Sequence, residues 1–335
     1  MSALEAYLNG IWYAPDRRPP LILLLLSRVY RWLIGVRQWL YRMGLRRSHG
    51  CGRPVVIVGN ITVGGSGKTP LVLWLVDRVR GLGFRPGVIS RGYRGVVGKG
   101  PHRVVEGDSP RLVGDEPLLI ARRTGVPVAV GSNRVACARL LAPDVDLIIS
   151  DDGLQHLAMQ RHLEFAALDG SRGIGNGRLI PAGPLREPMD RLNRVDMVLR
   201  KGRDWALQGE DLVNLRDAER RIEPSALQGR ERVHAVAGIA RPAGFFGQLQ
   251  PLIGRPLIEH PYPDHHAFSE DELAELAGEC VVMTEKDAVK CAPFAGEDWW
   301  AFPVAADLDG QLTERIDALL RHILETGATW NDSSS

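Results

Sequence analysis

Residues 62–70, TVGGSGKTP, have the composition of a phosphate-binding loop. They follow the apolar run PVVIVGN and precede a stretch with helical apolar spacing, so the pattern predicts a strand, a glycine-rich loop and a helix in that order. In this arrangement the backbone N–H groups of the loop and the helix N-terminus converge on a polyphosphate. Lys68 then reaches the terminal phosphates, and the hydroxyl of Thr69 can ligate Mg²⁺. The spacing therefore predicts a site for nucleotide phosphates.

The loop departs from the usual GxxxxGK[ST] pattern at one position, because Thr62 stands where the first glycine is expected. The glycines further along still supply the permissive backbone that close approach to a phosphate requires. A glycine-rich turn with an incidental lysine is the alternative, and the flanking strand and helix argue against it. We assign nucleotide binding to Thr62, Val63, Gly64, Gly65, Ser66, Gly67, Lys68 and Thr69.

A second buried strand is predicted in PDVDLIISDDGLQH, where apolar residues lead to Asp151 and Asp152. Paired carboxylates at the end of a strand are typical of a Walker B element, whose carboxylate meets Mg²⁺ directly or through water. A helix cap or a turn would also explain aspartates at this position. Beside a phosphate loop, the interpretation as a magnesium site is favoured.

Two further stretches carry groups that could take up a proton. GDEP places Asp115 and Glu116 before a predicted helix, so either acid could be a base, and N-capping of that helix is the alternative. DHHAFS places His265 and His266 before another predicted helix. Adjacent side chains point in different directions, so at most one of these histidines serves a site. A kinase needs one such group, since phosphoryl transfer otherwise depends on positioning and charge neutralisation.

Two other segments are also charged. GRLIPAGPLREP is rich in Gly and Pro, which predicts a loop, and it carries Arg178, Arg186 and Glu187; a plain crossover is the alternative. CVVMTEKDAVKC predicts a strand followed by a helix, with Lys286 near the helix start. The NKxD pattern of GTPases is absent there, because Asp287 follows Lys286 directly. This argues against a GTPase.

The N-terminal segment is basic, since residues 1–53 hold nine arginines against only Glu5 and Asp16. Its longest uninterrupted apolar run has six residues, too few for a membrane span. At helical spacing two sides separate: an apolar one with Ile22, Leu25, Val29, Leu33, Val36, Leu40 and Met43, and a basic one with Arg28, Arg31, Gln38, Arg42 and Arg46. This predicts a helix in a membrane interface, with arginines near anionic lipid head groups. A basic helix packed on its own domain is the alternative, and the long leucine block disfavours nucleic-acid binding.

Length and composition favour two domains, because 335 residues with 44% hydrophobic content can form two cores. Four cysteines lack the spacing of a metal site or a disulfide framework, which favours a reduced, cytoplasmic setting. We predict two α/β/α domains, the first a mostly parallel, P-loop NTPase-like sheet, preceded by the amphipathic membrane helix. The predicted boundaries are 1–52 for the membrane-association segment, 53–203 for the core domain, 204–213 for a linker, 214–328 for a smaller α/β domain and 329–335 for a disordered tail.

The chain closely resembles the tetraacyldisaccharide 4'-kinase family, from about Tyr7 to Leu324, in VGNITVGGSGKTP, SRGY, GDEP, DDGLQH, RLIPAGPLREP, DHHAFS and TEKDAVK. The resemblance implies ATP as phosphate donor and Mg²⁺ as metal. It also implies that the 4'-hydroxyl of tetraacyldisaccharide 1-phosphate, a lipid A precursor, is the acceptor and lipid IVA the product. A monotopic enzyme at the cytoplasmic face of the bacterial inner membrane is expected, and the basic helix would hold it at the bilayer.

The resemblance further implies roles for individual residues. Asp115 and His265 are expected to form the dyad that prepares the acceptor hydroxyl, while Lys68 carries phosphate charge. Thr69 and Asp152 are expected to ligate magnesium, with Asp151 and Glu187 as further expected ligands. The expected supporting residues are Glu116, Gln155, His156 and Arg186. Which member of the dyad takes the proton is left open at this stage.

Two other functions share part of the pattern. A membrane-tethered P-loop ATPase, acting as a conformational switch or energy coupler, would need the same loop and the same basic helix. A soluble kinase of small metabolites would need the loop, but this function would not account for the N-terminal segment rich in leucine and arginine.

Overall fold

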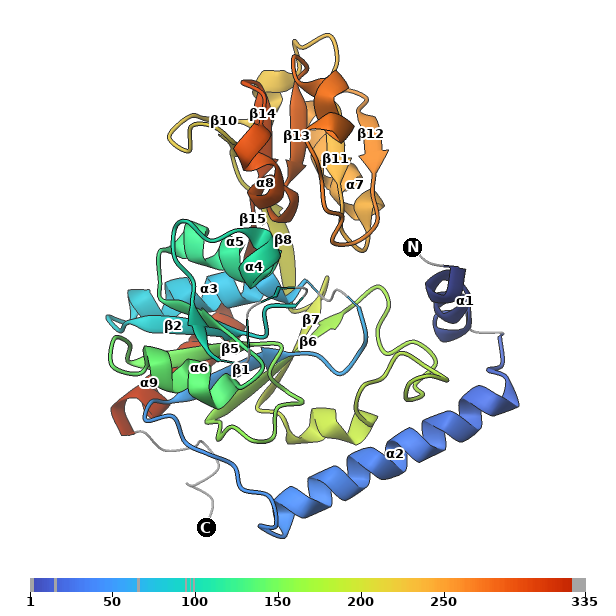
Figure 1. Ribbon diagram of the computed structural model, residues 1–335, viewed down its shortest axis with the longest axis vertical. Coiled ribbons are helices and arrows are strands. Elements are labelled where there is room, and N and C mark those ends of the chain that lie inside the picture. The colour runs from blue at the N-terminus through green and yellow to red at the C-terminus, as the bar shows by residue number, and fades with distance from the viewer. Residues whose placement is uncertain are drawn as a thin grey trace.

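The computed structural model describes residues 3–14, 17–64, 67–93, 95–96, 98 and 100–326, which form two lobes, each built on its own sheet (Figure 1). Both sheets are mostly parallel, which confirms the predicted α/β class. Two residues of the glycine-rich loop, Gly65 and Ser66, and the predicted tail at 329–335 lie outside the described residues.

The sheet of the first lobe has the strand order β15-β8-β7-β6-β1-β5-β2-β4-β3. Its strands are β1 (Val55–Gly59), β2 (Pro86–Ser90), β3 (His102–Arg103), β4 (Val128–Val130), β5 (Leu147–Asp151), β6 (Leu163–Asp169), β7 (Met197–Lys201), β8 (Trp205–Gly209) and β15 (Val304–Leu308). The central strands are short apolar runs because helices cover both faces of the sheet. β1 and β5 are parallel neighbours, with Val58 opposite Asp151, so the segments after these two strands leave the same edge.

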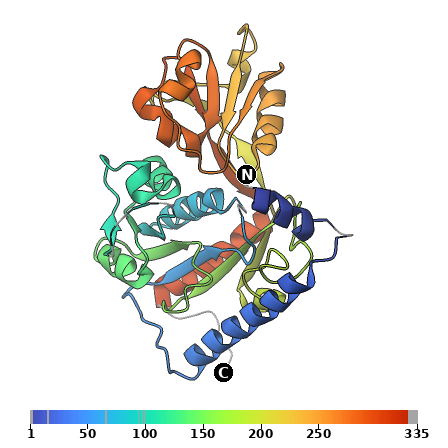
Figure 2. The ribbon, with the colours of Figure 1, turned by 45° about the vertical axis from the view of Figure 1, so that its right-hand side comes forward.

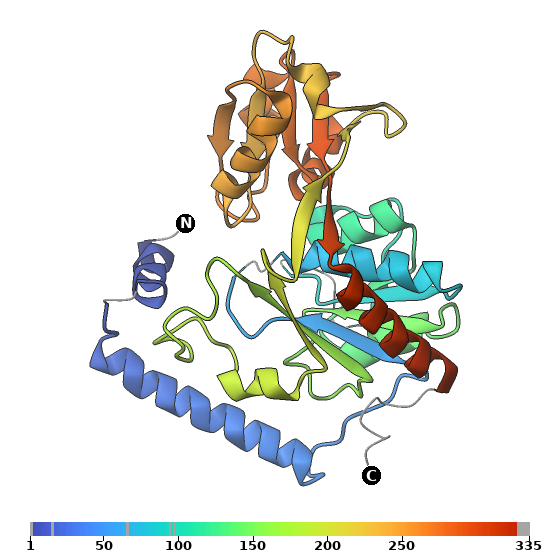
Figure 3. The same ribbon diagram turned by 180° about the vertical axis from the view of Figure 1, so that it is seen from behind.

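Side chains of β1 alternate between two cores. Val56 and Val58 pack with α3 (Lys68–Gly81) and α9 (Gly310–Thr326) on one face, where Figure 3 shows α9 lying across the sheet. Val55 and Ile57 face the other side and pack with α6 (Arg134–Leu141). Two more helices, α4 (Pro110–Val113) and α5 (Asp115–Thr124), lie on the side of the first lobe that meets the second (Figure 1).

The second lobe has the strand order β10-β9-β14-β13-β11-β12. Its strands are β9 (Leu212–Asn214), β10 (Arg221–Ile222), β11 (His234–Ala237), β12 (Ile258–Pro261), β13 (Val281–Thr284) and β14 (Trp299–Phe302). Its helices are α7 (Pro242–Ile253), α8 (Glu285–Cys291) and the 3₁₀ turns η2 (Pro224–Leu227), η3 (Asp271–Leu276) and η4 (Ala292–Phe294). α7 packs on one face, whereas η3 and α8 pack on the other, so this lobe has cores of its own.

The connection between the lobes is a pair of antiparallel strands, β8 leading out of the first lobe and β15 leading back (Figure 3). The sequence predicts a second domain over 214–328, but β15 pairs with β8 in the first sheet and α9 belongs to the first core. The physical reason is burial: Ile316, Leu320 and Ile323 of α9 are fully buried against that sheet. Residues 304–326 therefore complete the first lobe.

The N-terminal helices lie outside the first lobe, with α1 (Ala3–Trp12) near the lobe junction and α2 (Leu21–Arg42) running along the base beside the 3₁₀ turn η1 (Met189–Arg194) (Figures 1 and 2). Tyr30 and Ile34 of α2 pack against the first lobe. The opposite side of α2 exposes Leu21, Ile22, Leu25, Leu26, Val29, Trp32, Leu33 and Trp39. Among the residues placed in the structure, no helix is long and apolar enough to span a membrane.

Candidate active site

The glycine-rich loop joins the end of β1 to the start of α3. Gly64 and Gly67 have positive φ angles of 101° and 67°, a conformation that favours glycine. α3 begins at Lys68, and no side chain caps its N-terminus. The loop is hydrogen-bonded to the segment before Arg186, because the backbone N–H of Val63 donates to the carbonyl of Pro184 at 2.8 Å. The sequence thus places a helix N-terminus, a lysine and a positive-φ loop together.

Asp152 stands directly after β5, at the same edge of the sheet. Its carboxylate lies 3.2 Å from Nζ of Lys68 and accepts two hydrogen bonds from Arg186, at 2.9 and 3.0 Å. Its φ of 51° is unusual for a residue other than glycine, and residues held in such conformations cluster at functional sites. Asp151 points elsewhere: it is buried and accepts a hydrogen bond from the hydroxyl of Ser90 at 3.3 Å.

The loop residues predicted as supporting the site also meet here. Nε of Arg186 donates to the carbonyl of Thr62 at 2.9 Å, which ties it to the glycine-rich loop. Glu187 is buried and accepts a hydrogen bond from Nε2 of Gln155 at 2.9 Å. His156 follows Gln155, but its buried Nε2 has no hydrogen-bond partner within the described part of the chain. The structure therefore joins Arg186, Glu187 and Gln155 to the loop and leaves the ring of His156 outside this network.

The candidate dyad joins the two lobes. Asp115 is the first residue of α5 in the first lobe, and His265 precedes η3 in the second. Nδ1 of His265 lies 2.8 Å from Oδ2 of Asp115 and 3.2 Å from its Oδ1. The backbone fixes the histidine, because its φ is 58° and its N–H donates to the carbonyl of Gly238 at 3.0 Å. Residues 150 positions apart in the sequence thus form one hydrogen-bonded pair.

Lys286 completes this cluster, although its sequence pattern predicts only a position near a helix start. It lies in the first turn of α8, and its Nζ is 3.1 Å from Nε2 of His265 and 3.3 Å from Oε1 of Glu116. It also lies 3.5 Å from Asp264. Its side chain is only 16% exposed, so these charges interact with little screening by water. The motif TEKDAVK marked a helix start, but only the packing of the two lobes brings its lysine to the dyad.

Comparison with known proteins identifies the family. A sequence model of the family described as tetraacyldisaccharide-1-P 4'-kinase matches residues 20–321. Tetraacyldisaccharide 4'-kinases of Methylobacillus flagellatus and Alkalilimnicola ehrlichii are 47% and 48% identical to the chain; the alignments cover 90% and 93% of the chain and 93% and 94% of those proteins. The chain belongs to this family of kinases. The resemblance deduced from the motifs is thereby confirmed.

A solved structure of the same family has a similar fold. The crystal structure of LpxK from Aquifex aeolicus in complex with ATP superposes with a TM-score of 0.74 at 28% identity. The superposition covers 90% of this chain and 98% of that one. The match therefore extends over both lobes rather than over the nucleotide-binding half alone.

Burial and the charged groups of the site give two neighbouring aspartates, Asp151 and Asp152, different pKa values. Burial alone would raise the pKa of Asp152, but Lys68 and Arg186 hold it well below its usual range. Burial and, after it, the charge of Glu116 together raise the pKa of Asp151 to about 7. Asp152 is therefore the member of the pair that stays ionised at neutral pH.

The contacts of His265 select one tautomer of its neutral ring. Nζ of Lys286 is a donor, so Nε2 of that ring accepts, and Nδ1–H donates to Asp115. Burial acts to raise the pKa of Asp115, but the hydrogen bond from His265 and the charge of Lys286 outweigh it, and the pKa is lowered. Asp115 is thus an ionised carboxylate, oriented by histidine, and is able to accept a proton.

The neighbouring histidine is held in a different group. Nε2 of His266 pairs with Glu272 at 2.7 Å, and its ring packs against Tyr262 and Phe268. It has no contact with Asp115 among those found in the structure. The two adjacent histidines thus have separate partners, as their opposite directions predicted.

Metal ligation by protein side chains alone finds no support in the geometry. Within the described residues, no three side chains of His, Cys, Asp or Glu form a group that could hold a metal ion. Mg²⁺ in phosphoryl-transfer sites is usually bound by one or two carboxylates together with substrate phosphates, so such a cage is not required.

Replacing Lys286 by methionine should shift the pH dependence of kinase activity. The loss of its positive charge raises the pKa of Asp115 towards its usual value, so the fraction of ionised carboxylate falls at a higher pH than in the wild type. The acid limb of the kcat profile should therefore move to higher pH, whereas kcat at neutral pH, where the carboxylate stays ionised, should change much less. Lys286→Arg keeps the charge and serves as the control. An acid limb at the same pH in Lys286→Met and Lys286→Arg would show that the lysine does not act on Asp115.

Proposed function

We propose that this chain transfers the γ-phosphate of ATP to the 4'-hydroxyl of tetraacyldisaccharide 1-phosphate, giving lipid IVA. Family membership over almost the whole chain supports the reaction. The observation that carries the proposal for the site is the hydrogen bond between Asp115 and His265, because it brings a proton-accepting pair from two lobes to the edge of the sheet where Lys68 begins α3. A phosphate acceptor bound between the lobes would meet both groups.

For ATP we propose the glycine-rich loop, residues 62–69, as a P-loop. The uncapped N-terminus of α3, the positive φ of Gly64 and Gly67 and the position of Lys68 support this assignment. The Aquifex aeolicus relative with the similar fold was solved in complex with ATP, which is consistent with a nucleotide at this loop. Lys68 would neutralise charge on the phosphate that is transferred.

For Mg²⁺ we propose Thr69 and Asp152 as the residues that hold the ion. Asp152 fits the donor preference of this hard cation, because its carboxylate is anionic and its side chain is 35% exposed. Asp151 and Glu187, also predicted as ligands, are buried. They would act on the ion electrostatically, without ligating it directly. When bound, the ion supplies charge neutralisation to the phosphates of ATP. Some of the contacts that Lys68 and Arg186 make with Asp152 would be replaced by its contact with the ion.

For the acceptor we propose that Asp115 takes the proton of the 4'-hydroxyl. Its lowered pKa keeps the carboxylate ionised, and His265 orients it through the Nδ1–H group. Glu116, which shares Lys286 with the dyad, would help to keep the lysine in place. The chain thus supplies a base and charge, which are the contributions that phosphoryl transfer needs from the protein.

For the membrane we propose that α2 lies in the lipid interface at the cytoplasmic face of the inner membrane, near anionic lipids. Its apolar side chains point away from the first lobe, and Trp32 is 66% exposed there. An acylated acceptor remains in the bilayer, since burying each CH₂ group stabilises by about 0.8 kcal/mol. A helix of this kind would hold the site at the level of the sugar head group. A membrane-tethered ATPase without an acceptor is the alternative, and the family match does not favour it.

The central test is transfer of ³²P from γ-labelled ATP to tetraacyldisaccharide 1-phosphate in detergent micelles, with the lipids separated by chromatography. The wild type should give a labelled lipid. Lys68→Ala should reduce the rate of lipid labelling by about a hundredfold or more, because the positive charge of the lysine beside the phosphates is lost. ATP hydrolysis to free phosphate with an unlabelled lipid would instead support the coupling ATPase.

The membrane assignment is tested by Leu25→Ser/Trp32→Ser, which removes two apolar side chains from the exposed side of α2. Each is expected to contribute about 1–3 kcal/mol when buried in lipid, so the variant should bind vesicles of zwitterionic and anionic phospholipids at least about tenfold more weakly. Val105→Ser, an equally exposed apolar residue near the far edge strand β3, is the control. Equal vesicle binding by all three proteins in co-sedimentation would rule out α2 as the membrane contact.

A further inference from the structure

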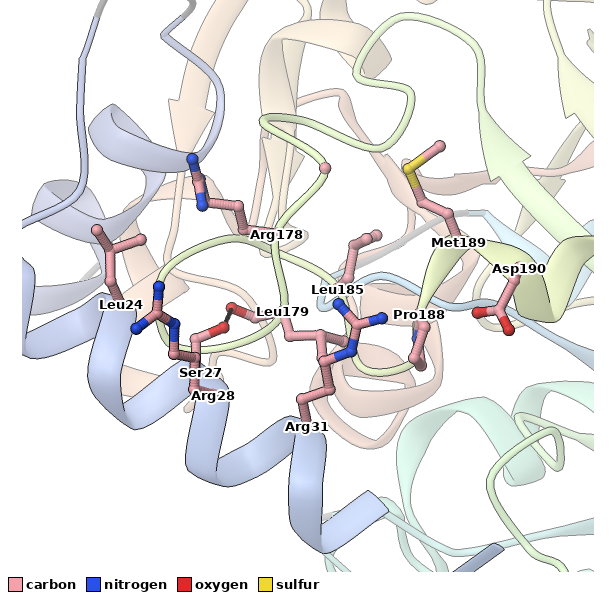
Figure 4. A pocket seen from close by; sticks show the side chains of 11 residues that line it. Leu24, Ser27, Arg28, Arg31, Arg178, Leu179, Leu185, Pro188, Met189 and Asp190 are labelled. Atoms are coloured by element: carbon pink, nitrogen blue, oxygen red, sulfur yellow. Dashed lines mark hydrogen bonds between the residues drawn. The ribbon is translucent and has the colours of Figure 1, made fainter. Parts of the chain in front are cut away.

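A cavity of about 500 Å³ lies between α2 and the loop that leads into η1 (Figure 4). α2 contributes Leu24, Ser27, Arg28 and Arg31 to its lining, and the loop contributes residues 177–179, 185 and 188–190. The hydroxyl of Ser27 donates to the carbonyl of Leu179 at 2.9 Å, so helix and loop are joined at the floor of the cavity. Of the described residues proposed above for ATP, metal or proton transfer, none lines it.

The cavity is strongly positive. Arg28, Arg31 and Arg178 line it, and Figure 4 shows Arg178 on the loop above the two arginines of α2. No acidic side chain of the described residues pairs with any of the three. Asp190, the one carboxylate in the lining, lies 3.2 Å from Arg194 and is thus engaged elsewhere. Guanidinium groups gathered around a hollow without a carboxylate partner are suited to a phosphate, which they bind through paired N–H donors.

The walls between the arginines are apolar. Leu24, Leu179, Leu185 and Met189 line the cavity, and the exposed apolar side of α2 begins beside it. A site for free inorganic phosphate has no need of such walls, whereas the phosphorylated end of an acylated sugar presents a phosphate next to apolar groups. The chemistry therefore fits a lipid-linked phosphomonoester.

The cavity is connected to the active site through one short segment. Leu185 and Pro188 line the cavity, and between them Arg186 extends to Asp152. The carbonyl of the same Arg186 accepts a hydrogen bond from the hydroxyl of Tyr30 on α2, at 3.0 Å. The segment 185–188 thus has the proposed catalytic cluster on one side and the arginines on the other.

We propose that Arg28, Arg31 and Arg178 form the binding site for the phosphomonoester at position 1 of the acceptor. This inference rests on the proposed function, since the family acts on a disaccharide that carries a phosphate at position 1 and is phosphorylated at position 4', on the other sugar. The acceptor would bridge segment 185–188, with its phosphate among the arginines and its free hydroxyl towards Asp115. The site would select acceptors that already carry that phosphate.

The test compares two acceptors, tetraacyldisaccharide 1-phosphate and the same lipid without its phosphate, in wild type and Arg31→Gln/Arg178→Gln. We expect the double variant to raise KM for the phosphorylated acceptor by about tenfold to a hundredfold, as for loss of charge-assisted hydrogen bonds, with kcat and KM for ATP unchanged. The acceptor without phosphate should have a high KM that the substitutions do not alter. Arg42→Gln, which removes an arginine of α2 outside the described cavity lining, is the matched control and should keep the wild-type ratio of KM between the two acceptors.

Equilibrium binding of the two lipids in micelles, measured without ATP, separates this proposal from the kinase proposal. The wild type could fail to transfer phosphate and yet bind the phosphorylated lipid more tightly than the double variant. That result would support the phosphate-binding site and contradict the proposed kinase activity. Phospholipid head groups are the other source of the same chemistry. If the double variant and Arg42→Gln both weaken binding to anionic vesicles, and KM rises equally for the two acceptors, the arginines serve the membrane and the proposal is overturned. Unchanged KM and affinity in the double variant would overturn it as well.

Discussion

The hydrogen bond between His265 and Asp115 is the contact on which the geometry of this site depends. At 2.8 Å it joins a loop of the second lobe to the first residue of α5 in the first lobe. Both partners are fixed by their backbones: Asp115 follows Gly114, whose φ of 92° favours glycine, and His265 itself has a positive φ. A second contact between the lobes, Arg123 to Glu285 at 2.6 Å, ties the other end of α5 to the start of α8. The proposed proton acceptor is thus positioned only when the lobes are together.

The remaining charges are arranged so that each anion faces a cation. Asp152 is shared by Lys68 and Arg186, and Lys286 is shared by Asp115, Glu116 and Asp264. Buried or half-buried charges are tolerated because they are paired in this way, and the pairing lowers the pKa of Asp152 and of Asp115, which keeps both carboxylates ionised. The arginines of the cavity beside α2 are the exception. Among the described residues no carboxylate pairs with them, which is why we propose a binding site there and not a structural ion pair.

Much of this was predictable from the sequence, because local pattern determines local structure. The strand, loop and helix around Lys68 occur as expected, and so do the strand that ends at Asp151 and the helix that begins at Asp115. Parallel pairing of β1 with β5 then brings these segments to one edge without further information. The motif resemblance named the family, which the comparisons confirm.

Other features depend on packing between distant segments, for which the sequence has no local signal. The return of β15 and α9 to the first lobe was missed because each would fit either lobe by composition, and the burial of Ile316 and Leu320 decides between them. Lys286 was read only as part of a helix start, since its partners are 21 and 170 positions away. Likewise, Arg28 and Arg31 were interpreted as facing lipid head groups, and only the fold shows that Arg178 meets them at a cavity.

The most direct test of this account is a double-mutant cycle on kcat with Asp115→Asn, His265→Ala and the two combined. If the pair acts as one unit, each single substitution should lower kcat by about 10²–10⁴-fold, and the double variant should be no slower than the slower single one. His266→Ala, next in the chain but paired with Glu272, should remain near the wild-type rate. Multiplying effects in the double variant, or a larger loss from His266→Ala than from His265→Ala, would contradict the role assigned to the contact between the lobes.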